Sequence, residues 1–446
     1  MRKKYIKTLL YFVSLGILLI PQTHTFSPTN KVVKEWTFIV YMAADNNLYY
    51  FARQNLEAMK SIGSNDRINI IVQIDHRGES LPPERLYIEK GKVNKLQQDN
   101  TSFVTKLDFG QIETLVDCMR WATTEYPAQH YALILWNHGI GAVDSIVGKA
   151  VNSSELFLFN PGTALLELNR NINFLEHFTQ EDDHRRGICF SDTYSTYITN
   201  QKLEVALQKI SMEVLGGNKI DILAFDACLM AMIEIASLAA PYCSIMVGSQ
   251  EVELGTGWPY EKILRRLAQE SLTPEEFAQH IVTSYYDYYQ YITKDFTQSA
   301  LDLACIYELE NNILQFAVLM IPLLKNPSYQ LLGKFIKSCK SKKLCTAFSE
   351  PSYIDLYHFY SNLLESINIL KSDSAFSPQF IAEFEHILTE GLRFIQKIVI
   401  KNGVGKNLER ARGISIYFPN YKIHTSYANT PFGLKTGWLN FLQSFL

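Results

Sequence analysis

The stretch DILAFDACLMAMIEIA (residues 221–236) decides the fold. An apolar run ends at Asp226, a small residue follows, and Cys228 stands before apolar residues at helical spacing. The pattern predicts a buried strand that turns directly into a helix, with Cys228 at the N-terminus of that helix. A helix N-terminus carries positive partial charge and lowers the pKa of a nearby thiol. Cys228 is therefore a candidate nucleophile, although a buried cysteine that only fills space stays open as the alternative.

Apolar strands and amphipathic helices alternate on both sides of this stretch. Such alternation predicts parallel βαβ units, and hence an α/β fold with helices on both faces of a mostly parallel sheet. After about residue 300 the pattern becomes largely helical, and it closes with a strand-like run, GISIYFP. The expected strands lie within residues 35–47, 67–76, 130–139, 187–193, 219–227 and 243–250, and the expected helices follow residue 47 and lie at 112–126 and 199–210, the last capped by Thr199 or Asn200.

Polar side chains follow three of the expected strands at their carboxyl ends, which is where ligand sites form in parallel sheets. These residues are Asp45 and Asn46, Asn137 and His138, and Asp226 and Cys228. For Asp45 we favour a structural role, as a carboxylate that ties down a loop. Asp226 also has a structural alternative, because Asp is a good helix cap.

The motif WNHGIG adds a base to the candidate thiol. His138 stands just beyond a strand end, where an imidazole can take the proton of a nucleophilic thiol. Gly139 has no side chain, so its backbone N–H and that of Cys228 can together stabilise an oxyanion. His130 is a weaker candidate because it begins the strand at the far edge of the sheet. We discount a zinc site, because these histidines, Cys189 and Cys228 lack the close spacing of zinc ligands.

The chain has 446 residues, a formal net charge of −3 and a pI near 6.4, so nothing in its overall charge points to a nucleic-acid partner. The N-terminus combines the basic segment MRKKYIK with the apolar run TLLYFVSLGILLI (residues 8–20). This arrangement predicts a secretory signal peptide within residues 1–25, and an uncleaved anchor remains the alternative. We therefore expect a secreted, periplasmic or cell-surface protein that meets a membrane only through this segment.

The seven cysteines are too few for a disulfide scaffold. Cys339 and Cys345 are close enough in sequence to pair in an oxidising compartment. They flank a lysine-rich run, KSCKSKKLC (residues 337–345), which we interpret as a solvated face. The remaining cysteines outside the 221–236 stretch lie in apolar surroundings and are expected to be buried or paired: Cys118, Cys189, Cys243 and Cys305.

Several motifs together resemble one known family. The segments WTFIVYMAADNNL, LILWNHGIG, DILAFDACLMAMIEIA, SQEVELGTGWPY, SYIDLYHFY and GISIYFP are similar to those of the clostripain family of cysteine peptidases, related to caspases and gingipains. The resemblance runs from Trp36 to Trp438. It implies a caspase-like peptidase domain at residues 33–300, completed by a helical region at 301–446. It also implies a catalytic dyad of His138 and Cys228, and cleavage after Arg or Lys with Asp226 lining the specificity pocket.

Two features depart from the family pattern. Some members carry a second acidic residue inside the G-x-G-W segment, where this chain has Thr256, so strict basic specificity is in question. The histidine loop, HGIGAVDS, is also poorer in glycine and lacks the following Trp. Neither departure removes a catalytic group.

The resemblance also implies internal cleavage after a basic residue beyond the histidine. The polar stretch 142–186 suits such a cut, with Lys149 as the preferred site and Arg170, Arg185 and Arg186 as alternatives.

We expect a peptide or protein substrate, and a monomer or a self-cleaved two-chain form. The sequence requires no cofactor and leaves a calcium requirement open. Two other functions also stay open: an inactive binding protein on the same fold, and another thiol enzyme such as an amidase or transpeptidase.

Overall fold

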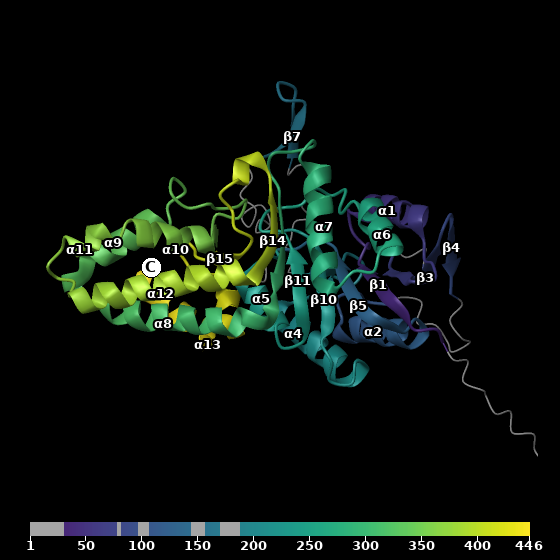
Figure 1. Ribbon diagram of the computed structural model, residues 1–446, viewed down its shortest axis with the longest axis horizontal. Coiled ribbons are helices and arrows are strands. Elements are labelled where there is room, and N and C mark those ends of the chain that lie inside the picture. Colours follow the sequence, from purple (N-terminus) through teal and green to yellow (C-terminus); the bar gives the residue numbers. More distant parts are fainter. Residues whose placement is uncertain (1–30, 78–81, 97–106, 144–156, 170–187) are drawn as a thin grey trace, which may run out of the picture.

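The computed structural model describes residues 31–77, 82–96, 107–143, 157–169 and 188–446 (Figure 1). The predicted signal segment lies outside the described residues. So do all four candidate cleavage sites, Lys149, Arg170, Arg185 and Arg186.

A nine-stranded sheet runs through the centre of the described structure. Its strands are β1 (Lys34–Met42), β2 (Ile68–Ile74), β3 (Glu84–Glu89), β4 (Lys92–Lys95), β5 (Ala128–Trp136), β10 (Ile220–Asp226), β11 (Cys243–Gly248), β12 (Thr297–Asp302) and β14 (Val399–Val404). They lie in the order β14-β12-β11-β10-β5-β1-β2-β3-β4. The five central strands, from β11 to β2, are parallel, and two antiparallel strands complete each edge. The predicted α/β fold with a mostly parallel sheet is confirmed.

The central strands are buried along almost their whole length, as their apolar sequences predict. Every residue of β2 is buried, and so are the last seven residues of β1 and the last five of β5. Parallel strands need such two-sided burial because helices cover both faces of their sheet. The sequence therefore places this part of the chain at the centre of the core.

Two layers of helices cover the sheet. In one layer α1 (Tyr49–Ile62), α6 (Tyr260–Gln269) and α7 (Pro274–Tyr289) pack in succession; in the other, α2 (Ile112–Glu125), α4 (Asn200–Lys209) and α5 (Ile233–Ala239) do so. The predicted cap of α4 is confirmed, because the Thr199 hydroxyl accepts a hydrogen bond from the Lys202 N–H at 3.1 Å.

Beyond residue 300 the chain forms a mainly helical region beside the sheet, on the left of Figure 1. Its helices are α8 (Ile306–Leu324), α9 (Gln330–Cys339), α10 (Leu356–Glu365), α11 (Asn368–Lys371), α12 (Pro378–Ile398), α13 (Pro431–Lys435) and α14 (Trp438–Phe445). The same region contributes edge strand β14 to the main sheet. It also forms a separate two-stranded sheet, in which β13 (Tyr353–Asp355) pairs with β15 (Ser415–Tyr417).

Two short hairpins stand apart from the main sheet: β6 (Phe157–Asn160) with β7 (Leu165–Leu168), and β8 (Ile188–Ser191) with β9 (Thr196–Ile198). The strand expected at 187–193 therefore forms as β8 but does not join the parallel core. Among the described residues, no helix has the length and apolar character needed to cross a membrane.

All seven cysteines are buried free thiols, so the suggested Cys339–Cys345 disulfide is wrong. The two thiols bond to different backbone carbonyls. Cys339 Sγ donates to Asn362 O at 3.6 Å, and Cys345 Sγ donates to Asp355 O at 3.7 Å. Nearness in sequence did not bring the two sulfur atoms together, because Cys339 ends α9 whereas Cys345 lies in the loop that follows.

Tyr353 links the helical region to the loop that carries the candidate histidine. Its hydroxyl donates to Ile140 O at 2.6 Å and accepts from the Val143 N–H at 3.3 Å, and all three residues are buried. Removing this hydroxyl leaves two buried backbone groups without their partner, which costs about 1–3 kcal/mol for each buried group left unpaired.

We predict that Tyr353→Phe lowers the free energy of unfolding by an amount of this order, measured by denaturant titration. The matched control is Tyr421→Phe, because Tyr421 is 91% exposed and its substitution should change stability very little. Equal stability of the two variants would show that the Tyr353 hydroxyl is not holding the histidine loop.

Candidate active site

The pairing of β5 with β10 brings the two candidate catalytic residues to one edge of the sheet. Asp226 is in register with Trp136, and the Asn137 N–H donates to Asp226 O at 3.3 Å. Cys228 and His138 each come two residues after this aligned pair. Both line one small pocket of about 30 Å³ at the carboxyl ends of the strands.

The turn that carries Cys228 differs from the prediction. Helix α5 begins only at Ile233, five positions after the cysteine, so the thiol is not at a helix N-terminus and that expectation is wrong. Leu229 has a φ of +63°, which is incompatible with continuing into a right-handed helix. The turn instead bonds to a neighbouring segment: the Leu229 N–H donates to Glu251 O, and the Ala231 N–H donates to Ser249 O.

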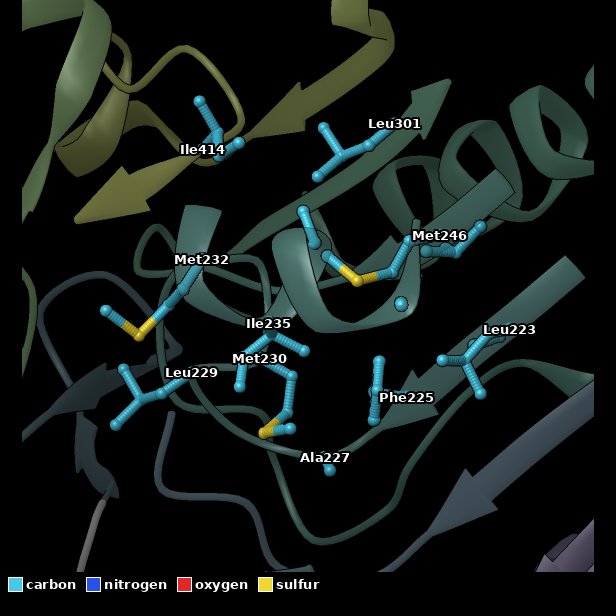
Figure 2. Close-up of a cluster of buried hydrophobic side chains, with 14 of the residues drawn as sticks. Leu223, Phe225, Ala227, Leu229, Met230, Met232, Ile235, Met246, Leu301 and Ile414 are labelled. Atoms are coloured by element: carbon cyan, nitrogen blue, oxygen red, sulfur yellow. The ribbon is translucent and has the colours of Figure 1, made fainter. Parts of the chain in front are cut away.

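Buried side chains hold this turn in place (Figure 2). Leu229, Met230 and Met232 are at most 2% exposed and lie in the same apolar cluster as Phe225 and Ile235, from the flanking strand and helix. The apolar pattern that suggested an uninterrupted helix thus reflects burial of an irregular turn. Burial of this kind offsets the strain of the positive φ at Leu229.

The Cys228 thiol is enclosed and hydrogen-bonded to one backbone unit. Its Sγ accepts from the Glu253 N–H at 3.2 Å and donates to Glu253 O at 3.8 Å. Burial raises the pKa of the thiol to about 12, and the Glu253 N–H offsets only part of this effect. The resting thiol is therefore neutral, and a base must remove its proton as it attacks.

His138 is held by a residue that the sequence reasoning missed. Its Nε2 lies 2.7 Å from Asn47 Oδ1. With this oxygen as the acceptor, Nε2 carries the proton and Nδ1 is the unprotonated ring nitrogen, which is the form of imidazole that can act as a base. Asn47 directly follows the strand-end pair Asp45 and Asn46, so the polar cluster after β1 was the available signal.

Gly139 allows the histidine loop to approach the nucleophile turn. A Cβ atom added at this position would lie 2.3 Å from Cys228 O, a distance no side chain tolerates. The hydrogen bonds of the described residues include none donated by the backbone N–H of Gly139 or Cys228. Within the described part of the chain, both amides therefore lack a protein acceptor, as an oxyanion-binding pair requires.

Asp226 lines the same pocket but caps no helix, so the capping interpretation is wrong. Its Oδ2 accepts from the Tyr260 hydroxyl at 2.7 Å and from the Trp258 N–H at 3.2 Å. Its side chain also hydrogen-bonds to that of Glu253, a second residue that the sequence reasoning missed. Two carboxyl groups can share a hydrogen bond only if one is protonated. Burial raises the pKa of Asp226 to about 6 and that of Glu253 well above its usual range.

The other expected residues lie around this pocket rather than in it. The Thr256 hydroxyl is 2.8 Å from the Tyr289 hydroxyl, and Thr256 lines an adjacent cavity of about 400 Å³. Asp45 ties down a loop, as predicted, because its Oδ2 accepts from the Ser191 hydroxyl and the Thr193 N–H. Within the described part of the chain, no three His, Cys, Asp or Glu side chains converge as metal ligands do.

A parallel sheet with a cysteine and a histidine beyond adjacent strands defines a class: caspase-like α/β proteins that carry the thiol and imidazole of a cysteine peptidase. Within that class, the chain belongs to the clostripain family, whose model matches residues 40–152 and 176–443. The family predicted from the sequence motifs is confirmed.

Clostripain of Hathewaya histolytica is 28% identical over 273 residues, which is 56% of this chain and 45% of clostripain. The chain thus spans less than half of that relative's length. A secreted C11 cysteine protease from Bacteroides thetaiotaomicron has a similar fold, with a TM-score of 0.60, 16% identity, and coverage of 91% of this chain and 100% of that one. An inactive zymogen C11 protease from Parabacteroides distasonis also has a similar fold, with a TM-score of 0.58 and 19% identity. The match covers 91% of this chain and 99% of that one.

Asn47 should act as a positioning residue for His138. We predict that Asn47→Ala lowers kcat on a peptide substrate roughly tenfold to hundredfold, below the 10²–10⁴ typical of losing the base itself, with little change in KM. The pH profile should move as well, because the imidazole loses the acceptor that fixes its tautomer. Steady-state kinetics across pH check this. A rise in KM alone, with kcat and the pH profile unchanged, would show that Asn47 does not position the base.

Proposed function

We propose that the chain is an exported cysteine endopeptidase that uses Cys228 and His138 and cleaves after Arg or Lys. The observation that carries the proposal is the convergence of the thiol and the imidazole on one pocket at the carboxyl edge of the sheet. Among solved neighbours, a secreted C11 cysteine protease of Bacteroides thetaiotaomicron is described in complex with an irreversible peptide inhibitor. That description supports a peptide or protein substrate for this chain, and its word "secreted" supports export.

The reaction begins with Cys228 attacking the scissile carbonyl carbon while His138 takes the thiol proton. The N–H groups of Gly139 and Cys228 stabilise the oxyanion that forms. His138 then gives the proton to the leaving amine, and a thioester remains on Cys228. Water, deprotonated by the same imidazole, hydrolyses the thioester and regenerates the thiol.

The carboxyl pair supports basic specificity despite the Thr256 departure. When Asp226 is ionised and Glu253 protonated, the pair carries one negative charge in a low-dielectric pocket, where a guanidinium or ammonium is its natural partner. The pocket of about 30 Å³ has room for roughly one water, so its walls must separate before a long basic side chain enters. Gly255 and Gly257 in those walls are suited to such a movement.

We predict that Cys228→Ala abolishes peptide hydrolysis and that His138→Ala lowers kcat by about 10²–10⁴, because proton removal and proton donation are both lost. Matched controls are Cys305→Ala, another buried free thiol, and His130→Ala, whose ring bonds to Asp221 near the start of β5 and β10. Activity on a fluorogenic peptide, with circular dichroism as the folding check, gives the measurement. Near wild-type turnover in a folded Cys228→Ala protein would refute the assignment.

A separate prediction concerns charge recognition. Asp226→Asn should weaken cleavage after Arg by about 2–5 kcal/mol in kcat/KM, while cleavage after an uncharged residue changes less. Glu253→Gln is the matched control, because it leaves Asp226 as the single negative charge and should retain the preference. In the wild type, the preference for Arg should fade as the pH falls through about 6, since Asp226 is then protonated. A preference that Asp226→Asn leaves intact would assign the charge to another group.

The last prediction for this function concerns self-processing. We propose cleavage in the 142–186 segment, most readily after Lys149, with the two fragments staying associated. Intact-mass spectrometry should find two chains in the wild type and one in the Cys228→Ala protein. A wild-type enzyme that remains one chain while hydrolysing peptides would show that processing is not required. Equal cutting of the Cys228→Ala protein would assign the cut to another protease.

A further inference from the structure

A second pocket, of about 360 Å³, lies in the region beyond residue 300 and shares no residue with the dyad pocket. Three segments form its walls: the loop at 342–348 between α9 and β13, the first turn of α10, and residues 406–410 after β14. The first segment includes the end of the lysine-rich run KSCKSKKLC. In the sequence that run reads as a solvated face, but the fold makes part of it the wall of a cavity.

The pocket is electropositive. Lys342, Lys406 and Arg410 line it, and none of them forms an ion pair with a described residue. Among the described residues, Glu409 is the one carboxylate in the wall. Arg410 also lies close enough to His358 and Cys345 to affect the pKa of each. Three cationic residues and one carboxylate thus line the same cavity, a balance that favours an anionic guest.

His358 adds a buried donor to this wall. Its Nδ1 accepts from the Thr346 N–H at 2.9 Å, so its Nε2 must carry the proton. His358 is only 6% exposed, and its Nε2 is buried without a hydrogen-bond partner among the described residues. Burial, together with Arg410 and Arg412, lowers the pKa of His358 to about 4, so the ring is a neutral donor at physiological pH. An oxygen acceptor in the pocket would satisfy it.

We propose that this pocket binds a small tetrahedral oxyanion, a phosphate or sulfate group, through Arg410, Lys406, Lys342 and the Nε2–H of His358. Such a group offers several acceptor oxygens in different directions, which matches donors on three separate wall segments. A planar carboxylate offers only two oxygens and would leave more of these donors unmatched.

Hydrogen bonds also connect the walls of this pocket to residues 250–251, the segment that supports the turn carrying Cys228. The His358 N–H donates to Asp355 Oδ1, and Asp355 Oδ2 accepts from Gln250 Nε2 at 3.0 Å. Nearby, the Ser349 N–H donates to both carboxylate oxygens of Glu251, whose carbonyl accepts from Leu229 beside Cys228. An anion that orders the wall should therefore stabilise the whole fold, because these contacts are buried.

Isothermal titration calorimetry tests the proposal. The purified protein is titrated with inorganic phosphate, inorganic sulfate and glycerol 3-phosphate in separate arms, with sodium chloride holding the ionic strength constant. We expect saturable binding of at least one of them, weakened at least tenfold by Arg410→Ala and by Lys406→Ala. These positions are exposed, so the variants should fold. Tighter binding of the ester than of either ion would identify a phosphate monoester as the guest, and the reverse a free ion.

Lys343→Ala is the matched control, because Lys343 belongs to the same lysine run but does not line the pocket. Binding should be unchanged in this variant, and the thermal unfolding midpoint should rise with anion in it and in the wild type, but not in Arg410→Ala. Absence of binding in all three arms would overturn the proposal. So would equal weakening by Lys343→Ala and Arg410→Ala, which would show only diffuse attraction of anions to a basic surface.

Discussion

The hydrogen-bonded pairing of β5 with β10 is the constraint on which the site depends. It sets Asp226 level with Trp136, and each strand then needs only two more residues to deliver His138 and Cys228 to the same edge. A slip of one residue would turn the side chains of β10 to the opposite face of the sheet. The fully buried central strands prevent that slip, because apolar side chains on both faces are already packed against helices. Gly139 completes the approach by leaving no side chain between the two loops.

Burial keeps the Cys228 thiol protonated when no substrate is bound. The Cys228 thiol has a pKa raised to about 12 and burial raises the pKa of Glu253 well above its usual range, so at neutral pH the enclosed cavity holds one negative charge, on Asp226, whose pKa is about 6. Under the proposed specificity, the cation of a basic substrate would further favour ionisation of Asp226, which lines the same pocket as Cys228. The same low dielectric that disfavours an isolated charge strengthens the pair once it forms. Under the proposed specificity, substrate charge would therefore be part of the electrostatics of the site and not merely a means of docking.

The sequence predicted features that depend on local pattern. Apolar runs located the parallel strands, and strand-end polarity with recognisable motifs located His138 and Cys228. Contacts between distant segments were not predictable in this way: Asn47 reaches His138 across 91 positions, and Glu253 meets Asp226 only because the loop after β11 folds back over β10. The helix start at Ile233 was also missed, because the positive φ of Leu229 belongs to an ordinary residue and follows from bonds to residues 249–251. Burial produces the same apolar letters in an irregular turn as in a helix.

The order of the strands also bears on what one break in the chain would do. Strands β1, β2 and β5 precede the 142–186 segment, whereas β10, β11, β12 and β14 follow it, so a cut in that segment would place His138 and Cys228 on different polypeptides. The two parts would still share one sheet through β5 and β10, and Tyr353 would still bond to Ile140 across the divide. Association would then rest on buried backbone hydrogen bonds and apolar packing, which do not depend on chain continuity. The pairing that aligns the two candidate catalytic groups is thus the same pairing that would keep the separated parts together.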